Sequence, residues 1–482
     1  MEKYTVYIGL EVHVELSTQS KLFCGCKTKF GAPPNTQTCP VCLGLPGVLP
    51  VINKKAVDFA IITALALNSQ INKNCRFARK NYYYPDLPKN YQISQYEEPL
   101  ATGGWVEINI NGKVKKIGIQ RIHLEEDAGK LIHGETEKDK DSSFVDYNRA
   151  GIPLIEIVSK PEISSPEEAH EYLVNLRRIL RYLGVSDCNM EEGSLRCDAN
   201  ISLGKDEKMG TKTELKNMNS FKEIREGLKA EIKRQAELLA KGEKIVQETR
   251  YWDPKKKKTF SMRGKEEAHD YRYFPEPDLP PLLIDDNWIE RLKSTLPELP
   301  QKRFKRFVRQ YGLPEYDAKV LTESREIADY FEECVKFFPK PKVVSNWIMG
   351  DFMRLIKQER KEQIKISPAA TCELLSEIEK GTLSINMAKQ VMEEMFKTGK
   401  GAFQIIEEKG LRQISDEKSL EEVAKEVIKE NPKAVNDWKK GKSQAMKFLV
   451  GQMMRKTKGK ANPQLANKLI EKKLREISEE TL

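Results

Sequence analysis

The chain has 482 residues, of which 32% are charged and 39% are hydrophobic, and its formal net charge is +10. No apolar run approaches the roughly 18–20 residues that a membrane span needs, so an integral membrane protein is not expected. A strand pattern starts within a few residues of Met1 and no leader peptide is visible, so we expect a cytoplasmic protein whose nine cysteines are reduced.

The first expected strand, residues 4–16, alternates between apolar and ionisable side chains. Its apolar residues fall on one face, and Glu11, His13 and Glu15 fall on the other. Two carboxylates that flank an imidazole are typical of ligands for a hard cation, or of acid–base groups on a rigid element. An ordinary exposed strand face is the alternative.

Two close pairs of cysteines follow this strand: Cys24 with Cys26, and Cys39 with Cys42. Four thiols at this spacing can surround one tetrahedral Zn²⁺, and four thiolate ligands leave no open position for water. The spacing therefore predicts a structural zinc knuckle over residues 24–42, with a set of reduced surface thiols as the alternative.

Three later strands repeat the polar pattern of the first. In the strand expected at 114–126, His123 and Glu125 share a face, whereas Glu126 falls on the other unless a bulge intervenes. The strands expected at 195–203 and 211–217 also alternate, and they present Arg196, Asp198, Asn200, Glu214 and Lys216. Carboxylates with an imidazole suit Mg²⁺ and basic groups suit phosphate oxygens, so the strands together predict a cleft for a metal-bound nucleotide. A solvated sheet face is again the alternative.

The usual phosphate-binding loops are absent from the sequence. It contains no G-x-x-x-x-G-K-[ST] motif, and no G-x-G-x-x-G sequence follows an expected strand. No cysteine–histidine pair and no serine- and glycine-rich stretch indicates a nucleophile for amide hydrolysis. An ATP site in this chain would therefore have to lie on the sheet.

Residues 1–293 mix strands and helices without strict alternation, which favours an α+β fold with a large, mainly antiparallel sheet. Further strands are expected at 105–110 and 153–159 and helices at 54–67, 166–183 and 220–241. Ser165 before Pro166 marks the start of the second helix, and Ser220 with Glu223 forms a capping box at the start of the third.

Residues 294–408 contain one helical pattern after another, the longest at 341–358, which predicts an all-α domain. Residues 409–482 are expected to form a small helical tail domain. In its first apolar face, Ala445, Phe448, Leu449 and Met453 recur at helical spacing.

The tail carries the basic character of the chain. Residues 431–475 contain 13 Lys or Arg and 2 acidic residues. The net charge of this stretch therefore exceeds the net charge of +10 of the whole chain, and the remainder of the chain is almost neutral. Such a charge distribution is typical of a segment that binds a polyanion.

Five stretches resemble the B subunit of the tRNA-dependent amidotransferases, the GatB family of aspartyl/glutamyl-tRNA(Asn/Gln) amidotransferases. They are IGLEVHVEL at 8–16, HLEEDAGK at 123–130, LRCDAN at 195–200, TELKNMNS at 213–220 and GQMMRKTKGKANP at 451–463. The resemblance implies a sheet cradle similar to that of glutamine synthetase, followed by a helical domain and a small helical tail.

The resemblance also implies a reaction. ATP phosphorylates the side-chain carboxylate of Glu-tRNA(Gln), Asp-tRNA(Asn) or both, and ammonia then displaces the phosphate to give the amide. The ammonia would come from glutamine hydrolysed by a separate amidase-fold glutaminase, the A subunit, with a small C subunit completing a heterotrimer. The absence of a nucleophile motif in this chain agrees with that division of labour.

Carried over by position, the family's motifs imply that Glu11, His13, Glu214 and one of Glu125 and Glu126 hold Mg²⁺. They imply contacts to phosphate or to the acceptor end for Arg196, Asn200 and Lys216. The four-cysteine site occurs in only some members, which supports a scaffold role. The tail is expected to bind tRNA outside its acceptor end through Lys439, Lys440, Lys442, Arg455, Lys456, Lys458 and Lys460.

Two other functions compete with this interpretation. A non-enzymatic zinc-knuckle RNA-binding protein explains the cysteines and the basic tail, but leaves Glu11, His13 and Glu214 without a purpose. A self-sufficient glutaminase is disfavoured because the sequence lacks a recognisable nucleophile motif.

Overall fold

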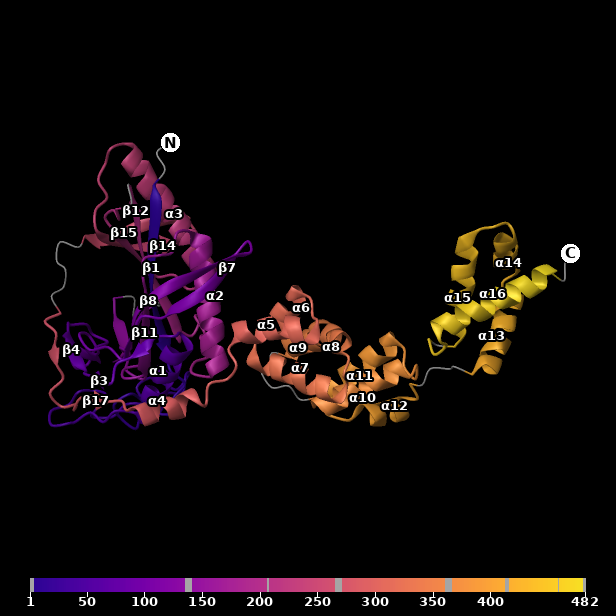
Figure 1. The fold of residues 1–482 in the computed structure, drawn as a ribbon, viewed down its shortest axis with the longest axis horizontal. Helices are drawn as coiled ribbons and strands as arrows, with labels where there is room; N and C mark the ends of the chain where they lie inside the picture. Colours follow the sequence, from indigo (N-terminus) through magenta and orange to yellow (C-terminus); the bar gives the residue numbers. More distant parts are fainter. Residues whose placement is uncertain are drawn as a thin grey trace. The chain divides into compact units, whose positions relative to one another are not determined.

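The computed structural model describes residues 4–134, 141–205, 208–264, 271–359, 366–411, 416–457 and 459–479. The chain divides into two compact units, Met1–Pro300 and Gln301–Leu482. Figure 1 shows that strands are concentrated in the first unit and that the second is helical.

The first unit is built on a mixed sheet of ten strands within the described residues. All of its pairs are antiparallel except that of β13 with β14. In spatial order the strands are β15 (Lys258–Gly264), β14 (Glu248–Asp253), β13 (Thr213–Lys216), β12 (Leu195–Gly204), β1 (Thr5–Glu15), β11 (Pro153–Ser159), β8 (Lys113–Glu126), β6 (Ala101–Thr102) and β2 (Gln70–Ile71), with β7 (Trp105–Ile110) paired to β8.

Three smaller sheets and four helices make up the rest of this unit as far as its residues are described. The small sheets pair β16 (Phe274–Pro275), β4 (Ala78–Asn81) and β5 (Tyr91–Ser94); β10 (Ser143–Asp146) and β9 (Lys130–His133); and β17 (Leu282–Leu283) and β3 (Asn74–Cys75). The helices are α1 (Lys54–Ala66), α2 (Pro166–Leu183), α3 (Phe221–Ala240) and α4 (Asp286–Lys293).

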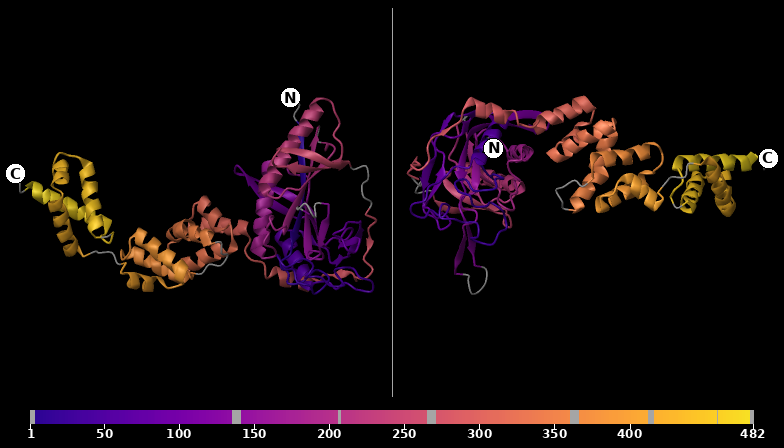
Figure 2. Two further views of the ribbon diagram at one scale, coloured as in Figure 1. Left: turned by 180° about the vertical axis from the view of Figure 1, so that it is seen from behind. Right: turned by 90° about the horizontal axis from the view of Figure 1, so that it is seen from below.

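Two long helices cover one face of the large sheet, and Figures 1 and 2 show α2 and α3 lying side by side along it. Leu10 and Val12 of β1 are fully buried in one core with Leu176 of α2 and Leu228 of α3. Because side chains alternate along a strand, the residues between these apolar positions point to the opposite face. That face carries the candidate site.

The expected caps start both helices. Ser165 Oγ accepts a hydrogen bond of 3.1 Å from Glu168 N, and Ser220 Oγ accepts one of 3.1 Å from Glu223 N. Glu223 Oε2 in turn accepts a hydrogen bond of 2.9 Å from Asn219 N. The sequence signals for both helix starts are therefore confirmed.

The second unit is helical in all its named elements. The helices are α5 (Pro300–Tyr311), α6 (Glu315–Leu321), α7 (Arg325–Phe337), α8 (Pro341–Trp347), the π-helical turn η1 (Ile348–Phe352), α9 (Met353–Glu359), α10 (Pro368–Glu379), α11 (Ile385–Thr398), α12 (Ala402–Lys409), α13 (Glu417–Glu430), α14 (Pro432–Lys439), α15 (Ser443–Lys456) and α16 (Pro463–Glu479). Its buried apolar residues form two clusters, one within residues 307–406 and one within 420–474.

The predicted α+β fold, with a mainly antiparallel sheet followed by helices, is confirmed. The helix expected at 341–358 is present as α8, η1 and α9 without a gap, and it contains a π-helical turn at η1, where Ile348 and Phe352 are both buried and Gly350 lowers the helix propensity. One detail of the prediction is wrong. Phe448 is 48% exposed instead of sharing the buried face of α15. The domain boundaries predicted at 293/294 and 408/409 stay a proposal.

Candidate active site

Strand register brings the ionisable residues of the sheet together on the face that the helices leave open. His13 of β1 lies opposite Glu156 of β11, and Glu156 lies opposite His123 of β8. On the other side of β1, His13 lies opposite Arg196, and Glu11 lies opposite Asp198 of β12. The four strands therefore form one row of charged side chains, as the alternation of β1, β8 and β12 predicted.

Two histidines and two glutamates form the most compact group of this row. His13 Nε2 lies 3.5 Å from Glu156 Oε2 and 3.6 Å from Glu125 Oε1. His123 Nε2 lies 3.1 Å from Glu156 Oε2 and 3.6 Å from Glu125 Oε2. We call these four residues the histidine–glutamate cluster.

Ligand atoms of His13, Glu125 and Glu156 all lie within 4.8 Å of one another, which is close enough to hold one cation. Ser94 Oγ donates to Glu125 Oε2 at 3.1 Å and fixes the orientation of this carboxylate. Two carboxylates and one imidazole make a donor set that suits a divalent cation.

The histidines and the glutamates of this cluster shift each other's pKa values. Burial lowers the pKa of His123, but the bonds to Glu125 and Glu156 outweigh it and raise the pKa to about 9. In the same way burial opposes the shift at His13, and Glu156 and Glu125 raise the pKa. Burial works against ionisation of Glu125 and Glu156, yet the imidazoles hold both carboxyl pKa values below their usual range. The imidazoles and the carboxylates thus favour each other's charged forms, and a bound cation would take over the role of the imidazoles.

A second group of charges continues the row across β12 and β13. Asn200 Nδ2 donates to Glu11 Oε1 at 2.8 Å, and Thr249 Oγ1 donates to Glu214 Oε2 at 2.7 Å. Lys216 Nζ bridges two carboxylates, 2.5 Å from Asp198 Oδ2 and 3.2 Å from Glu214 Oε1. Burial and the charges of Glu156, Asp198 and Glu214 raise the pKa of Glu11.

A hollow opens on the same face at the Gly9 end of β1. It is lined by Glu11, Asn200, Ser159, Met209 and Lys212, among others. A ligand in this hollow would contact the carboxylate of Glu11 directly and would lie along the charged row.

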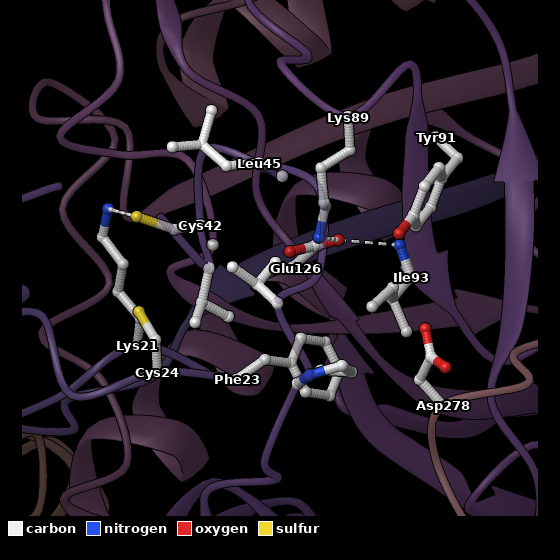
Figure 3. Close-up of a pocket in the computed structure, with 15 residues that line it drawn as sticks. Lys21, Phe23, Cys24, Cys42, Leu45, Lys89, Tyr91, Ile93, Glu126 and Asp278 are labelled. Atoms are coloured by element: carbon white, nitrogen blue, oxygen red, sulfur yellow. Dashed lines mark hydrogen bonds and ion pairs between the residues drawn. The ribbon is translucent and has the colours of Figure 1, made fainter. Parts of the chain in front are cut away.

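The side chains of Glu125 and Glu126 lie on opposite faces of the sheet. Glu126 forms an ion pair with Lys89 and accepts a hydrogen bond of 2.9 Å from Ile93 N, as Figure 3 shows. Its pocket also contains Cys24 and Cys42 and lies away from the histidine–glutamate cluster. No bulge intervenes in the described pairing at Glu125 and Glu126, so strand alternation places only Glu125 beside His13.

Arg196 closes one end of the row. Its Nη1 lies 2.8 Å from Asp127 Oδ2 and 3.7 Å from Glu15 Oε1. Burial and the charge of Asp127 raise the pKa of Glu15 to about 8.

Family models match both parts of the chain. The GatB/GatE catalytic domain matches residues 6–290, and the GatB domain matches residues 329–474. The chain is 57% identical over 482 residues to the aspartyl/glutamyl-tRNA(Asn/Gln) amidotransferase B subunit of Carboxydothermus hydrogenoformans, with 99% of this chain and 100% of that protein covered. It is 58% identical to the B subunit of Caldanaerobacter subterraneus subsp. tengcongensis, with 98% and 99% covered.

This chain belongs to the family of aspartyl/glutamyl-tRNA(Asn/Gln) amidotransferase B subunits.

Membership confirms the resemblance inferred from the five sequence stretches and the assignment to an amidotransferase, a carbon–nitrogen ligase. Within the described residues, no helix is both long and apolar enough to cross a membrane. The histidine–glutamate cluster and the charged row lie within the part that matches the family's catalytic domain.

The four cysteines expected to bind zinc come together in this member of the family. The sulfurs of Cys24, Cys26, Cys39 and Cys42 lie within 4.8 Å of one another. Cys42 Sγ accepts hydrogen bonds from Cys39 N at 3.1 Å and from the buried Lys21 Nζ at 3.6 Å. Interaction with Cys24 lowers the pKa of Cys42 to about 4. Four clustered thiols fit a tetrahedral zinc site, which stays a prediction.

The tail residues expected to bind tRNA have different surroundings. Lys439, Lys440, Lys442, Arg455 and Lys456 are exposed and Lys460 is half-buried, whereas Lys458 lies outside the described residues. Lys456 Nζ lies 2.7 Å from Glu426 Oε2 and 2.6 Å from Glu430 Oε1, so this lysine would have to exchange two carboxylates for a phosphate.

Sequence reasoning missed Glu156 as a site residue. Its strand was expected, but the apolar residues around it suggest a strand buried on both faces. The one signal was a single carboxylate in the middle of that apolar run, since a buried carboxylate requires a partner.

Proposed function

We propose that this protein uses ATP to phosphorylate the side-chain carboxylate of Glu-tRNA(Gln), Asp-tRNA(Asn) or both, and then forms the amide with ammonia. The observation that carries the proposal is the buried histidine–glutamate cluster, in one row with Lys216 and Arg196, within a family of amidotransferases. A docking surface for RNA has no need for two buried carboxylates beside two imidazoles.

The cluster fits a magnesium ion through the chemistry of its donors. His13, Glu125 and Glu156 would hold the ion, and proteins commonly bind Mg²⁺ through one or two carboxylates while substrate phosphates complete the shell. Glu11 and Glu214 lie further along the row, next to the hollow and to Lys216. When bound, the cation would neutralise charge on the transferring phosphoryl group.

The carboxylate needs this activation because oxide is a poor leaving group. One of its oxygens attacks the γ-phosphorus of ATP, the bond to the bridging oxygen breaks, and ADP leaves. Ammonia then attacks the acyl carbon, the bond to the phosphate oxygen breaks, and the nitrogen loses one proton as the amide forms. We assign Lys216 to bind phosphate oxygens, and Glu11 with Asn200 to orient the nucleotide in the adjoining hollow.

The ammonia would come from glutamine hydrolysed by a separate amidase-fold A subunit, with a small C subunit completing the complex. The cysteines of this chain support that division. Four belong to the proposed zinc site, and the other five (Cys75, Cys188, Cys197, Cys334 and Cys372) are buried in the two cores without access to a substrate. The basic tail would bind the body of the tRNA through its phosphates.

The test is Mg²⁺-dependent ATP hydrolysis by the assembled complex in the presence of Glu-tRNA(Gln) or of uncharged tRNA. We expect the charged tRNA to stimulate turnover, and His13→Ala to abolish that stimulation. His133→Ala is the matched control, because His133 is exposed on β9. If the wild-type complex binds tRNA but shows no ATP turnover, the enzymatic proposal fails and an RNA-binding scaffold replaces it.

A further inference from the structure

Four tyrosines form a connected cluster beside β8. The rings of Tyr96 and Tyr273 are stacked, with centroids 4.1 Å apart and planes inclined by 6°. Tyr271 contacts Tyr273 edge-on at 6.0 Å and Tyr82 at 5.8 Å. We call these residues the tyrosine platform.

The platform is held firmly by the small sheet of β16, β4 and β5. Asn81 N donates to Tyr271 O at 2.9 Å, and Asn81 Nδ2 donates to Arg272 O at 2.8 Å. Arg79 binds Glu276 through two hydrogen bonds of 2.7 and 2.9 Å. These contacts tie residues 271–276 to β4, so the rings are preorganised for a flat ligand.

The platform borders the histidine–glutamate cluster. Ser94, whose hydroxyl donates a hydrogen bond to Glu125, lies two residues before Tyr96. Between them, Gln95 Oε1 accepts a hydrogen bond of 3.0 Å from Leu124 N of β8. Burial raises the pKa of both Tyr82 and Tyr273, and the negative charge of Glu125 raises each further.

The platform is also open to a ligand, and a lysine lies against the ring of Tyr271. Tyr96 is 47% exposed, and it lines a hollow with Tyr273, Phe274, Arg76 and the carboxylates of Glu97 and Glu98. Arg76 Nε lies 3.8 Å from Glu98 Oε2. Lys80 Nζ lies 4.8 Å from the centroid of the Tyr271 ring. Tyrosine rings next to a lysine suit an unpaired nucleobase and its phosphate.

We propose that the tyrosine platform stacks the unpaired terminal base of the tRNA 3′ end, and so places the attached amino acid at the histidine–glutamate cluster. This inference rests on the proposed function, and it names positioning residues for the RNA substrate. The nucleotide has a separate place in the hollow at Gly9 and Glu11. That hollow lies along β1 from His13, whereas the platform lies beyond Glu125 on β8. The two substrates would thus reach the cluster from different sides.

The experiment measures binding of the assembled complex to uncharged tRNA with an intact or an abasic 3′-terminal nucleotide. Stacking of one base on an aromatic side chain contributes about 1–3 kcal/mol, so we expect the abasic end to weaken wild-type binding by about tenfold. Tyr96→Leu should weaken binding of intact tRNA by a similar factor and lose the preference for the intact end. Tyr96→Phe should retain both, because it keeps the ring.

Tyr316→Leu is the matched control, since Tyr316 is 74% exposed on α6 and belongs to no part of the site. If Tyr96→Leu keeps the wild-type preference for the intact end, the platform does not stack the terminal base. Weaker ATP binding with unchanged tRNA binding would instead assign the rings to the nucleotide and would also overturn the inference. Because the assay needs no turnover, it gives an answer even if the proposed phosphorylation fails.

Discussion

At the level of single residues, Glu156 holds the cluster together because it lies between both histidines. Its Oε2 is 3.5 Å from His13 Nε2 and 3.1 Å from His123 Nε2. No other described carboxylate except Glu125 contacts both rings. Replacing Glu156 would therefore disturb His13 and His123 at once.

We predict that Glu156→Gln raises the Mg²⁺ concentration needed for half-maximal ATP turnover by at least tenfold. It removes a proposed ligand, and losses of this size already follow removal of groups that only orient the ligands. The measurement is a Mg²⁺ titration of the assembled complex. Glu167→Gln, at an exposed site on α2, should leave the requirement unchanged. An unchanged Mg²⁺ requirement in Glu156→Gln would remove this residue from the metal site.

At the level of elements, an ion-pair network joins α5 to α7 in the helical unit. Arg303 Nη2 lies 2.5 Å from Glu332 Oε2, and Arg306 Nη1 lies 2.6 Å from Glu332 Oε1. Tyr311 OH donates to the same carboxylate at 2.9 Å. Burial alone would raise the pKa of Glu332, but the bonds from Arg306, Tyr311 and Arg303 lower it to about 2.

A lowered carboxyl pKa stabilises the folded state above the unfolded pKa of 4.5, and this stability is lost as the pH falls toward 2. Allowing for solvent screening, we predict that Glu332→Gln destabilises α7 by about 1–2 kcal/mol at pH 7 and by clearly less at pH 3. Hydrogen exchange of the α7 amides measures this difference, with the more exposed Glu333→Gln as control. An equal effect at both pH values would contradict the assigned network.

The elements that the sequence predicted best are those with a strict period. Strand β1 alternates without interruption, so its two faces, including Glu11 and His13, followed from the pattern alone. The π-helical turn at Ile348–Phe352 did not, because its extra residue depends on how Ile348 and Phe352 pack in the core. The same limit applies to Glu156, whose partners come from two strands that are distant in sequence.

At the level of the whole molecule, the proposed function combines a cleft for small charged groups with a basic surface for a long polyanion. The tail lysines near the end of α14 and the start of α15 are exposed, and phosphate contacts of this kind release counterions. Each lost contact should reduce the salt dependence of tRNA binding without changing which base is preferred.

We predict that replacing Lys439, Lys440 and Lys442 together by Ala makes the negative slope of log K against log salt shallower by about 2–3. The measurement is tRNA binding by the assembled complex between low and physiological salt. Replacing the three lysines Lys233, Lys241 and Lys244 of the first unit, which are also exposed, should leave the slope unchanged. Equal slopes for the tail variant and the wild type would exclude phosphate contacts at these lysines.

We propose that this chain transfers the γ-phosphoryl group of ATP to the side-chain carboxylate of the charged tRNA. The most direct measurement follows ¹⁸O from that carboxylate during amide formation by the assembled complex. Because ammonia displaces the phosphate together with a carboxylate oxygen, we expect one ¹⁸O in each inorganic phosphate released, and no labelled phosphate with His13→Ala. Phosphate without ¹⁸O, released while the amide forms at the normal rate, would contradict phosphoryl transfer to the carboxylate.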